Sequence, residues 1–399
     1  MIIIKQYYTK IQPLKCNQTD YNSIINLNIE SAKVWNSCIK LDNIYKNKTK
    51  KHITRWDLQK ELKGKFNLHS KNIQHVIKKY SQNISDAYAS IKAKHENSYK
   101  VNLPYKLKNY YTTGWDNQSV KRFGNFILLP KPIKIINGKN KLQKPYKCYV
   151  KNPPENIVEV ELIYRGNSYY LAIKYKKEKE YLQIQSKNEA SIDLGEIHSI
   201  TSIDNNGNAL IITGRQLRSI KRLRNKHLGK LRSKMDKCKK YSNQWNKYNK
   251  AIRNLSWKFS NKIIDATHKI SNLYVNYCIE NNVSVVYYGD LDSCTRNTKK
   301  RMGKKVGQKL NQWNYGQLIC ILKNKFNKHN IKLVKVKEYY TSKKCPKCEQ
   351  LNNPNGRVYI CNNCEYTMHR DINGAINIFN DNSNYKIIKY ENMKYLRIA

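Results

Sequence analysis

Two closely spaced cysteine pairs constrain the fold of this chain more than any other sequence feature. Cys345 and Cys348 form one Cys-x-x-Cys pair, Cys361 and Cys364 form the second, and 12 residues separate them. Because each pair sits on a tight turn, a short hairpin would bring the four thiolates together as a tetrahedral metal site. We expect Zn²⁺ rather than an iron–sulfur cluster. Its role would be structural, since four protein ligands leave no position open for a substrate.

The charge balance of the chain points to a polyanionic partner. The 399 residues include 76 Lys and Arg against 28 Asp and Glu, which gives a formal net charge of +48. A surplus this large repels itself unless a polyanion is present, so we expect a nucleic-acid partner rather than a free-standing metabolic enzyme. Hydrophobic residues make up 40% of the chain, which is enough for folded cores and excludes a wholly disordered basic protein.

The other cysteines and the apolar segments bear on the compartment. Seven of the 11 cysteines are scattered without pattern, which is typical of a reducing, intracellular compartment and not of a disulfide-stapled secreted protein. The apolar run at the N-terminus is too short for a signal peptide. No stretch approaches the ~20 apolar residues of a membrane span, so we expect no membrane partner.

The period of the apolar residues changes along the first half of the chain. Residues 1–13 predict a strand, and apolar residues recur every three or four positions over residues 14–98, which predicts helices. From Leu103 to about Lys176 the period is two, with turn signals at Asn137-Gly138 and Gly166-Asn167. We interpret these strands as a small β-barrel or an open sheet, completed by the N-terminal strand.

A third pattern begins near residue 189. Three short strands at 190–194, 199–203 and 209–212 are followed by a long helical stretch. Beyond it the chain alternates strand, helix, strand and helix. This order of elements fits an RNase H-like α/β domain.

The chain has few acidic residues, and four of them lie where a predicted strand ends or a predicted helix begins. Their positions make them candidates for a functional site. Asp193, Asp290 and Glu338 follow predicted strands, and Asp371 opens the last predicted helix. Each alone is more often a cap or turn residue. In an RNase H-like sheet, however, these strand ends and that helix start lie close together. Three converging carboxylates hold two Mg²⁺ ions about 4 Å apart for phosphodiester hydrolysis.

Several of these residues resemble one known family. Asp193-Leu194-Gly195, the two cysteine pairs and residues 370–378 look like the RuvC-type nuclease core of TnpB proteins. TnpB proteins are transposon-encoded, RNA-guided DNA endonucleases; Fanzor proteins of eukaryotes and viruses are relatives, and type V CRISPR effectors are more distant ones. The resemblance is specific over about residues 186–380. The Asn-, Lys-, Ile- and Tyr-heavy composition suggests an A+T-rich genome, which fits a giant-virus Fanzor at least as well as a bacterial protein.

The resemblance implies a multidomain α+β fold. Its parts would be an α-helical recognition domain (14–98), a wedge β-barrel (1–13 and 99–185), an RNase H-like (RuvC) nuclease domain (186–342 and 370–380), an inserted zinc ribbon that binds target nucleic acid (343–369), and a C-terminal tail (381–399). It also implies a guide RNA and double-stranded target DNA as partners, and two catalytic Mg²⁺ ions held by Asp193, Asp371 and one further acid.

One position departs from the family pattern. Many members carry Glu-Asp-Leu after the fourth strand, whereas this chain reads Gly289-Asp290-Leu291. We expect Glu338, at the end of the adjacent strand, to supply the missing acid. Asp290 is the alternative, although a shift of one residue along a strand turns its side chain to the other face. A third reading is that the site is inactive.

Two other functions remain open on the sequence. A nuclease-dead protein would keep the binding features and act as an RNA-guided repressor. A guide-independent zinc-ribbon protein, such as a direct transposase, would bind nucleic acid without a guide. We expect a nuclear protein if the host is eukaryotic or viral and a cytoplasmic one if it is bacterial. The sequence does not determine the oligomeric state, with a monomer slightly favoured.

Overall fold

The computed structural model describes residues 2–92, 101–136, 139–184, 186–291, 303–354 and 356–398. The chain divides into two compact units, Lys5–Lys179 and Met1–Ile4 with Glu180–Ala399. The predicted turn at Asn137-Gly138 lies outside the described residues. Among the described residues, no helix combines the length and the apolar character needed to cross a membrane.

Three helices form the first part of the N-terminal unit: α1 (Gln18–Thr49), α2 (Arg55–Leu62) and α3 (Ser70–Lys92). Side chains fix where they begin. The Asn17 side chain accepts a hydrogen bond from the Asp20 N–H at 2.7 Å. Thr54 accepts one from the Asp57 N–H at 3.2 Å. These contacts satisfy amide groups that the first turn of a helix leaves without partners.

The strands of the N-terminal unit form open sheets among the described residues, so the β-barrel that the resemblance implied is wrong and the alternative of an open sheet is the one found. The largest sheet has the order β1-β9-β8-β2, and the others pair β3-β4-β7 and β5-β6. Their bounds are β1 Ile2–Pro13, β2 Thr113–Asp116, β3 Lys121–Phe123, β4 Phe126–Leu129, β5 Lys134–Ile136, β6 Lys139–Lys141, β7 Tyr146–Tyr149, β8 Asn156–Arg165 and β9 Ser168–Tyr181.

Helices, and not further strands, cover the inner face of the four-stranded sheet. β1 and β2 stay at the two edges of the four-stranded sheet, while Trp35 and Tyr80 from the helices share one buried core with Trp115 and Leu162 from the strands. Burying the inner face of the sheet against α1 and α3 removes the need to close it. The predicted helical and wedge segments are therefore parts of one compact unit.

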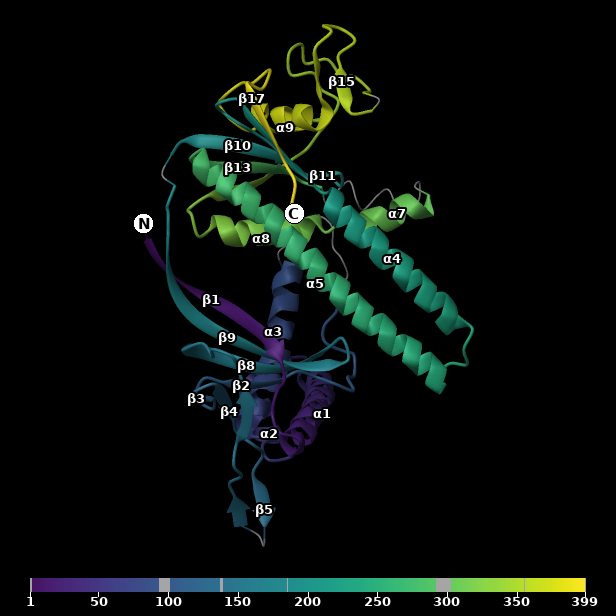
Figure 1. Cartoon of the computed structure of the whole chain (residues 1–399). Coiled ribbons are helices and arrows are strands. Elements are labelled where there is room, and N and C mark those ends of the chain that lie inside the picture. Colours follow the sequence, from purple (N-terminus) through teal and green to yellow (C-terminus); the bar gives the residue numbers. More distant parts are fainter. Residues whose placement is uncertain are drawn as a thin grey trace. The chain divides into compact units, whose positions relative to one another are not determined.

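The C-terminal unit is built around a six-stranded sheet of order β14-β13-β10-β11-β12-β17 (Figure 1). The bounds of its elements are β10 Asn188–Asp193, β11 His198–Asp204, β12 Asn208–Thr213, α4 Arg215–Asp236, α5 Asn243–Glu280, β13 Val283–Gly289, α7 Lys304–Asn311, α8 Tyr315–Phe326, β14 Lys332–Val336, β15 Val358–Ile360, β16 Thr367–His369, α9 Arg370–Asn380 and β17 Asn392–Leu396. The predicted order of three strands, helices, strand, helix, strand and helix is found among these elements, while α7 and β17 are additions that the sequence did not predict.

The directions in which the strands pair bring the carboxyl ends of three strands to the same side of this sheet. β10 pairs antiparallel with β11 but parallel with β13, which in turn pairs parallel with β14. The carboxyl ends of β10, β13 and β14 therefore lie side by side. β17 pairs parallel with β12, so the sheet includes part of the segment interpreted from the sequence as a separate tail.

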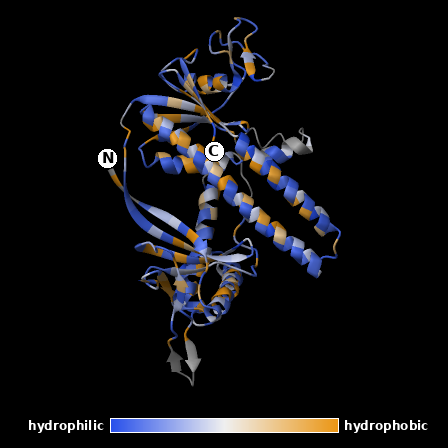
Figure 2. Ribbon diagram, in the orientation of Figure 1, coloured by the Kyte–Doolittle hydropathy of each residue, from blue (hydrophilic) through white to orange (hydrophobic). Residues whose placement is uncertain are grey.

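Apolar residues cover both faces of the sheet. Ile203 and Ile211 pack with Ile376 of α9 in one buried cluster. Ile192 and Ile212 belong to another, with residues of α5 and α8. Figure 2 shows hydrophobic stretches on the strands and on the helices that cover them. Two buried faces hold the strand ends rigidly in register, which is what a site built from several strands needs.

Candidate functional site

The four paired cysteines meet as the sequence predicted. Their sulfur atoms all lie within 4.8 Å of one another. The Cys345 and Cys364 sulfurs are 3.7 Å apart, and those of Cys348 and Cys361 are 3.5 Å apart. A tetrahedral zinc with bonds of about 2.3 Å requires sulfur separations of about 3.8 Å. The cluster thus has the ligands and the spacing that Zn²⁺ needs.

The two cysteine pairs sit on equivalent turns. The Glu349 N–H donates to the Cys345 carbonyl at 2.8 Å, and the Glu365 N–H donates to the Cys361 carbonyl at 3.0 Å. Glu349 and Glu365 both have left-handed backbone angles, with φ of 62° and 55°. The antiparallel β15–β16 hairpin carries the second pair, and the buried ring of Tyr359 packs against the cluster.

Asp193 ends β10 beside helix α9. A Cβ atom added to Gly374 of α9 would lie 2.9 Å from the Asp193 Oδ2 atom, so only a glycine lets the helix come this close. Burial raises the pKa of the Asp193 carboxyl well above its ordinary value, and the nearby charges of Glu338 and Asp371 raise it further. This carboxylate is therefore costly to ionise unless a cation lies beside it.

Glu338 follows β14 and fills a space that Gly289 of the neighbouring strand leaves open. Gly289 pairs with Val336 across the sheet, and a Cβ atom at Gly289 would lie 2.2 Å from the Glu338 Oε2 atom. The Thr341 hydroxyl donates to the other oxygen, Oε1, at 3.0 Å. Burial raises the pKa of Glu338, which the Thr341 hydrogen bond opposes and the charge of Asp290 reinforces.

Asp371 opens helix α9 and is held by two basic side chains. Its Oδ2 atom lies 2.7 Å from the Nδ1 atom of buried His198 and 3.1 Å from the guanidinium of Arg357. Burial alone would raise its pKa, but His198 and Arg357 outweigh that effect and lower it. The His369 ring accepts a hydrogen bond from the Asp371 N–H at 3.3 Å and so caps the helix.

Three of the four predicted acids share one pocket. Asp193, Glu338 and Asp371 line a hollow of about 480 Å³. Asp290 is not among the described residues that line it; it pairs with Lys335 at 2.9 Å instead. Three carboxylates around one hollow, with Glu338 held by Thr341 and Asp371 held by His198, fit the oxygen donor set that Mg²⁺ prefers.

Sequence reasoning missed two members of this site. His198 lies at the start of β11 and Arg357 just before β15, and both contact Asp371. Neither residue belongs to a sequence motif that would indicate its role in the site. His198 follows Asp193 by five residues, however, and a histidine so close to a candidate acid could have been flagged.

Two segments of the chain match known protein families. Residues 172–294 match the family described as "Probable transposase" (OrfB_IS605). Residues 315–378 match the "Cas12f1-like, TNB domain". The second match spans the cysteine cluster and most of α9.

One relative and one solved structure extend these matches. A TnpB-like protein of Methanocaldococcus jannaschii is 30% identical over 191 residues, which cover 47% of this chain and 67% of that protein. The Cas12f1 chain of a Cas12f1–sgRNA–target DNA complex superposes with a TM-score of 0.63 at 16% identity. That likeness covers 91% of this chain and 83% of the other, and it shows a shared fold. With a 30% identical relative aligned over two thirds of its length, this chain belongs to the TnpB family.

Proposed function

We propose that this protein is an RNA-guided DNA endonuclease that hydrolyses phosphodiester bonds at Asp193, Glu338 and Asp371. The observation that carries the proposal is the pocket these three acids share, with the carboxyl of Glu338 in the space beside Gly289. The matched relative is named TnpB-like, and the matched fold comes from a complex of Cas12f1 with guide RNA and target DNA. Both names support the same kind of activity.

The residues of the pocket prepare it for cations. Mg²⁺ bound by the three acids would supply the Lewis-acid chemistry of phosphodiester hydrolysis. His198 and Arg357 keep Asp371 ionised by stabilising its charge. Thr341 holds one oxygen of Glu338, which leaves the other to face Gly289 and the pocket. Burial makes Asp193 and Glu338 costly to ionise, and a bound Mg²⁺ would stabilise both in their charged form.

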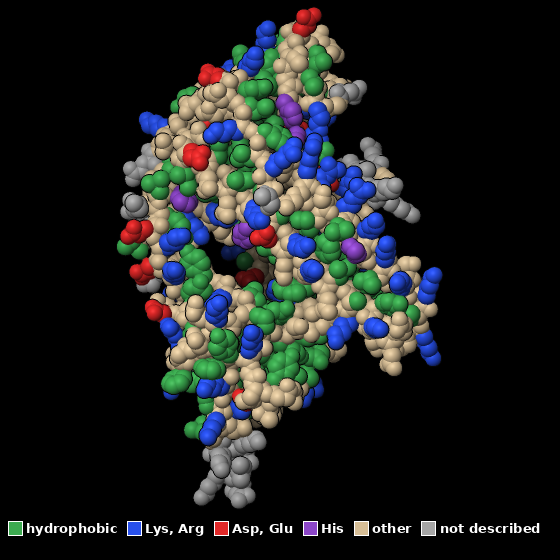
Figure 3. Space-filling view, in the orientation of Figure 1, with side chains coloured by type: hydrophobic (Ala, Val, Ile, Leu, Met, Phe, Trp, Pro, Cys, Tyr) green, Lys and Arg blue, Asp and Glu red, His purple; other side chains and the backbone are tan. Residues whose placement is uncertain are grey.

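The remaining surface suits the partners we propose, a guide RNA and double-stranded DNA. In complexes of this kind base pairing reads the target sequence, while the protein grips the backbone. Lys and Arg side chains are spread over the face drawn in Figure 3, with Asp and Glu sparse. We propose Zn²⁺ in the cysteine cluster, where it would fold a segment too small to fold alone.

The test is a cleavage assay on ribonucleoprotein purified after co-expression with the DNA that flanks the gene. We expect one enriched RNA species and Mg²⁺-dependent cutting of a plasmid that matches its guide segment. Asp193→Asn and Glu338→Gln should each lower the cutting rate by at least about a thousandfold, a loss of roughly 4 kcal/mol of transition-state stabilisation. The control Asp290→Asn should cut at close to the wild-type rate.

Each competing reading has its own outcome in this assay. Enriched RNA and specific DNA binding without cutting would support the nuclease-dead repressor. A random RNA population would support guide-independent binding. Loss of cutting in Asp290→Asn, with Glu338→Gln unaffected, would transfer the second acid to Asp290.

A further inference from the structure

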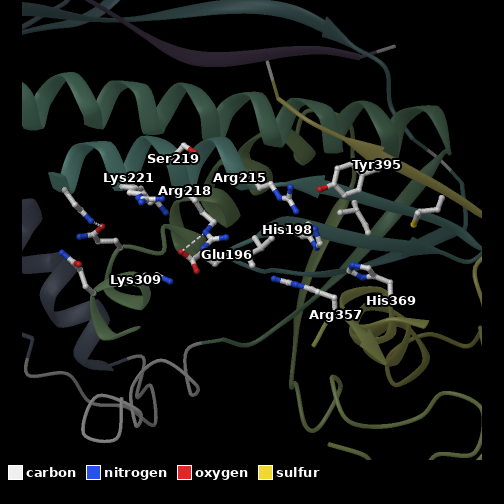
Figure 4. A pocket seen from close by; sticks show the side chains of 17 residues that line it. Glu196, His198, Arg215, Arg218, Ser219, Lys221, Lys309, Arg357, His369 and Tyr395 are labelled. Carbon is white, nitrogen blue, oxygen red and sulfur yellow. Dashed lines mark hydrogen bonds and ion pairs between the residues drawn. The ribbon is translucent and has the colours of Figure 1, made fainter. Parts of the chain in front are cut away.

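Three groups of described side chains have the donor atoms and the spacing to hold a metal ion. The first is the cysteine cluster. The second includes His198 and His369 of the site described above, which Figure 4 shows from close by. The third lies in the N-terminal unit and consists of His75, Glu159 and Glu161. We call this third group the His75 cluster.

The backbone brings the three donors of the His75 cluster together. Glu159 and Glu161 are two residues apart on β8, so both side chains leave the same face of the strand. β2 pairs with β8, and Gly114 of β2 lies opposite Glu161. A Cβ atom at Gly114 would lie 2.4 Å from the His75 Nε2 atom, so the glycine leaves the space that the ring occupies. The Asn72 side chain donates to the Gly114 carbonyl at 2.7 Å, which fixes α3 at this point of β2.

The His75 ring is buried and lies close to both carboxylates. Only 7% of the residue is exposed, and Nε2 lies 2.6 Å from the Glu159 Oε1 atom and 3.3 Å from the Glu161 Oε1 atom. Burial alone would lower the pKa of His75, but the two glutamates outweigh that effect and raise it. A positive charge is therefore stabilised beside Nε2, and either a proton or a metal ion can supply it.

The direction of these contacts favours a metal ion over a proton. Neither ring nitrogen of His75 makes a hydrogen bond. The 2.6 Å separation from Glu159 is short enough for one, so the carboxylate oxygen must lie off the axis of the ring N–H. A metal ion bound by Nε2 would lie on that axis, and its other ligands would lie beside the axis, as these carboxylates do. In contrast, His52 Nδ1 makes an ordinary hydrogen bond to Asp42 at 2.7 Å.

The separations within the cluster are near those of ligands that share one ion. Bonds of about 2.1 Å at tetrahedral angles place two ligand atoms about 3.4 Å apart. The 3.3 Å between His75 Nε2 and Glu161 Oε1 matches this value. Glu159 would have to move outward by less than about 1 Å. Its side chain is 21% exposed, which leaves room for that adjustment.

Lys79 is the cation that a metal ion would have to displace. Its Nζ atom lies 2.8 Å from the Glu161 Oε1 atom. The Lys79 side chain is 44% exposed, so the ammonium group can turn to solvent when an ion binds. The lysine therefore competes for the site without closing it.

The donor set selects the kind of ion. One imidazole nitrogen and two carboxylate oxygens are ligands of Zn²⁺, whereas Mg²⁺ prefers oxygen ligands alone. We propose that the His75 cluster is a Zn²⁺ site that joins α3 to β8. With three protein ligands in place of four thiolates, it should lose its ion during purification and refill at micromolar Zn²⁺. The cysteine cluster should keep its ion throughout.

The test is zinc binding by the full chain carrying Asp193→Asn and Glu338→Gln, which keep Zn²⁺ out of the acid pocket. After equilibration at micromolar free Zn²⁺, elemental analysis should find one ion per chain more than in the same protein with Glu159→Gln or His75→Gln. Each of these changes should weaken binding of that ion by at least about a hundredfold, more than the loss of a residue that only orients a ligand. Because the readout is a difference of one ion, it does not depend on the zinc content of the cysteine cluster.

His52→Gln is the matched control. His52 is also a histidine of the N-terminal unit beside a carboxylate, but its contact with Asp42 is a hydrogen bond. The control should keep the additional ion. Glu159 is partly exposed, so Glu159→Gln decides the question if the buried His75→Gln variant does not fold. Equal unfolding temperatures of Glu159→Gln and the control, measured without added Zn²⁺, would exclude misfolding as the cause of a difference.

X-ray absorption at the zinc edge identifies the ligands of the additional ion. Zn–S bonds are about 2.3 Å long and Zn–N and Zn–O bonds about 2.0–2.2 Å, so the parent protein should show both classes and Glu159→Gln only sulfur. Equal zinc contents in the parent, Glu159→Gln and His75→Gln proteins would overturn the proposal and leave a proton as the cation of the cluster. Loss of the ion in His52→Gln, or its displacement by millimolar Mg²⁺, would also overturn it. None of these results depends on whether the protein cuts DNA.

Discussion

At the scale of single residues, the proposed site is defined by a change in the strand that supplies the second acid. Gly289 stands where the family pattern has that acid, and Glu338 follows the neighbouring strand. The family pattern carries its second acid on the strand that here ends in Gly289. We propose that in this chain the acid is Glu338, which follows the adjacent strand and whose Oε2 atom occupies the space beside the glycine. The same volume of the pocket can thus receive a carboxylate from either strand.

If the second acid has changed strand, a glutamate placed at position 289 should replace Glu338. Glu338→Ala should abolish cutting, and adding Gly289→Glu to that variant should restore part of the activity, because the new carboxylate would enter the vacated space. Gly289→Ala alone should lower activity, since its Cβ would meet the Glu338 carboxyl. Cleavage rates of the three ribonucleoproteins check this, and an inactive double variant with a normal unfolding temperature would contradict it.

His198 is predicted to position Asp371. His198→Leu removes the hydrogen bond to Asp371 and should raise the Mg²⁺ concentration for half-maximal cutting by about tenfold or more, the usual effect of losing a partner of a metal ligand. His198→Asn keeps an N–H donor near the Nδ1 position and should recover much of the loss. An unchanged Mg²⁺ dependence in His198→Leu would show that the contact does not orient the acid.

At the scale of elements, the segment that carries the four clustered cysteines (residues 345–364) is tied to the helix that carries Asp371. The side chains of Asn373 and Asn377 in α9 donate to the Lys344 carbonyl, just before the first cysteine, at 3.0 and 2.8 Å. The Arg370 N–H donates to the Arg357 carbonyl at 2.8 Å. The cysteine cluster therefore supports both Arg357 and the N-terminus of α9.

Loss of the metal should act through this support. Cys361→Ser is expected to reduce bound zinc, measured by elemental analysis, from one ion per chain to none, and to lower the cutting rate by about a hundredfold or more. Cys320→Ser replaces an exposed cysteine outside the cluster and serves as the control. Full activity of a zinc-free protein would refute the coupling.

The most accurate and the least accurate predictions from the sequence both concern these helices and strands. Buried strands and their ends followed from apolar runs bounded by turns, which is why Asp193 and Asp371 could be found. Periodicity left a β-barrel and an open sheet as alternatives, because it does not say whether a helix or another strand covers a sheet. The Gly289–Val336 pairing that places Glu338 depends on lateral register, which a single strand does not encode.

At the scale of the whole molecule, burial of Asp193 and Glu338 carries a stability cost that a bound metal ion would relieve. The pKa values of Asp193 and Glu338 are raised on folding, so the folded protein binds protons more tightly there than the unfolded chain does. Their contribution to stability therefore falls as the pH rises through the raised pKa values. Asp371, with a lowered pKa, contributes stability above its ordinary pKa and loses it as the pH falls.

This balance predicts opposite effects of neutralising the acids. In Mg²⁺-free buffer at pH 7.5, with the cysteine cluster loaded with Zn²⁺, Asp193→Asn and Glu338→Gln should raise the unfolding temperature by a few degrees, and the gain should shrink toward pH 5. Asp371→Asn should lower the unfolding temperature, because it removes the partner of His198 and Arg357. Scanning calorimetry at the two pH values measures this, and a lower unfolding temperature in all three variants at pH 7.5 would contradict it.

The most direct measurement of the central claim is anomalous diffraction from crystals of the full chain soaked in Mn²⁺. The account predicts Mn²⁺ peaks coordinated by the carboxylates of Asp193, Glu338 and Asp371. Peaks at Asp290, or a pocket without Mn²⁺ in crystals of active protein, would contradict it.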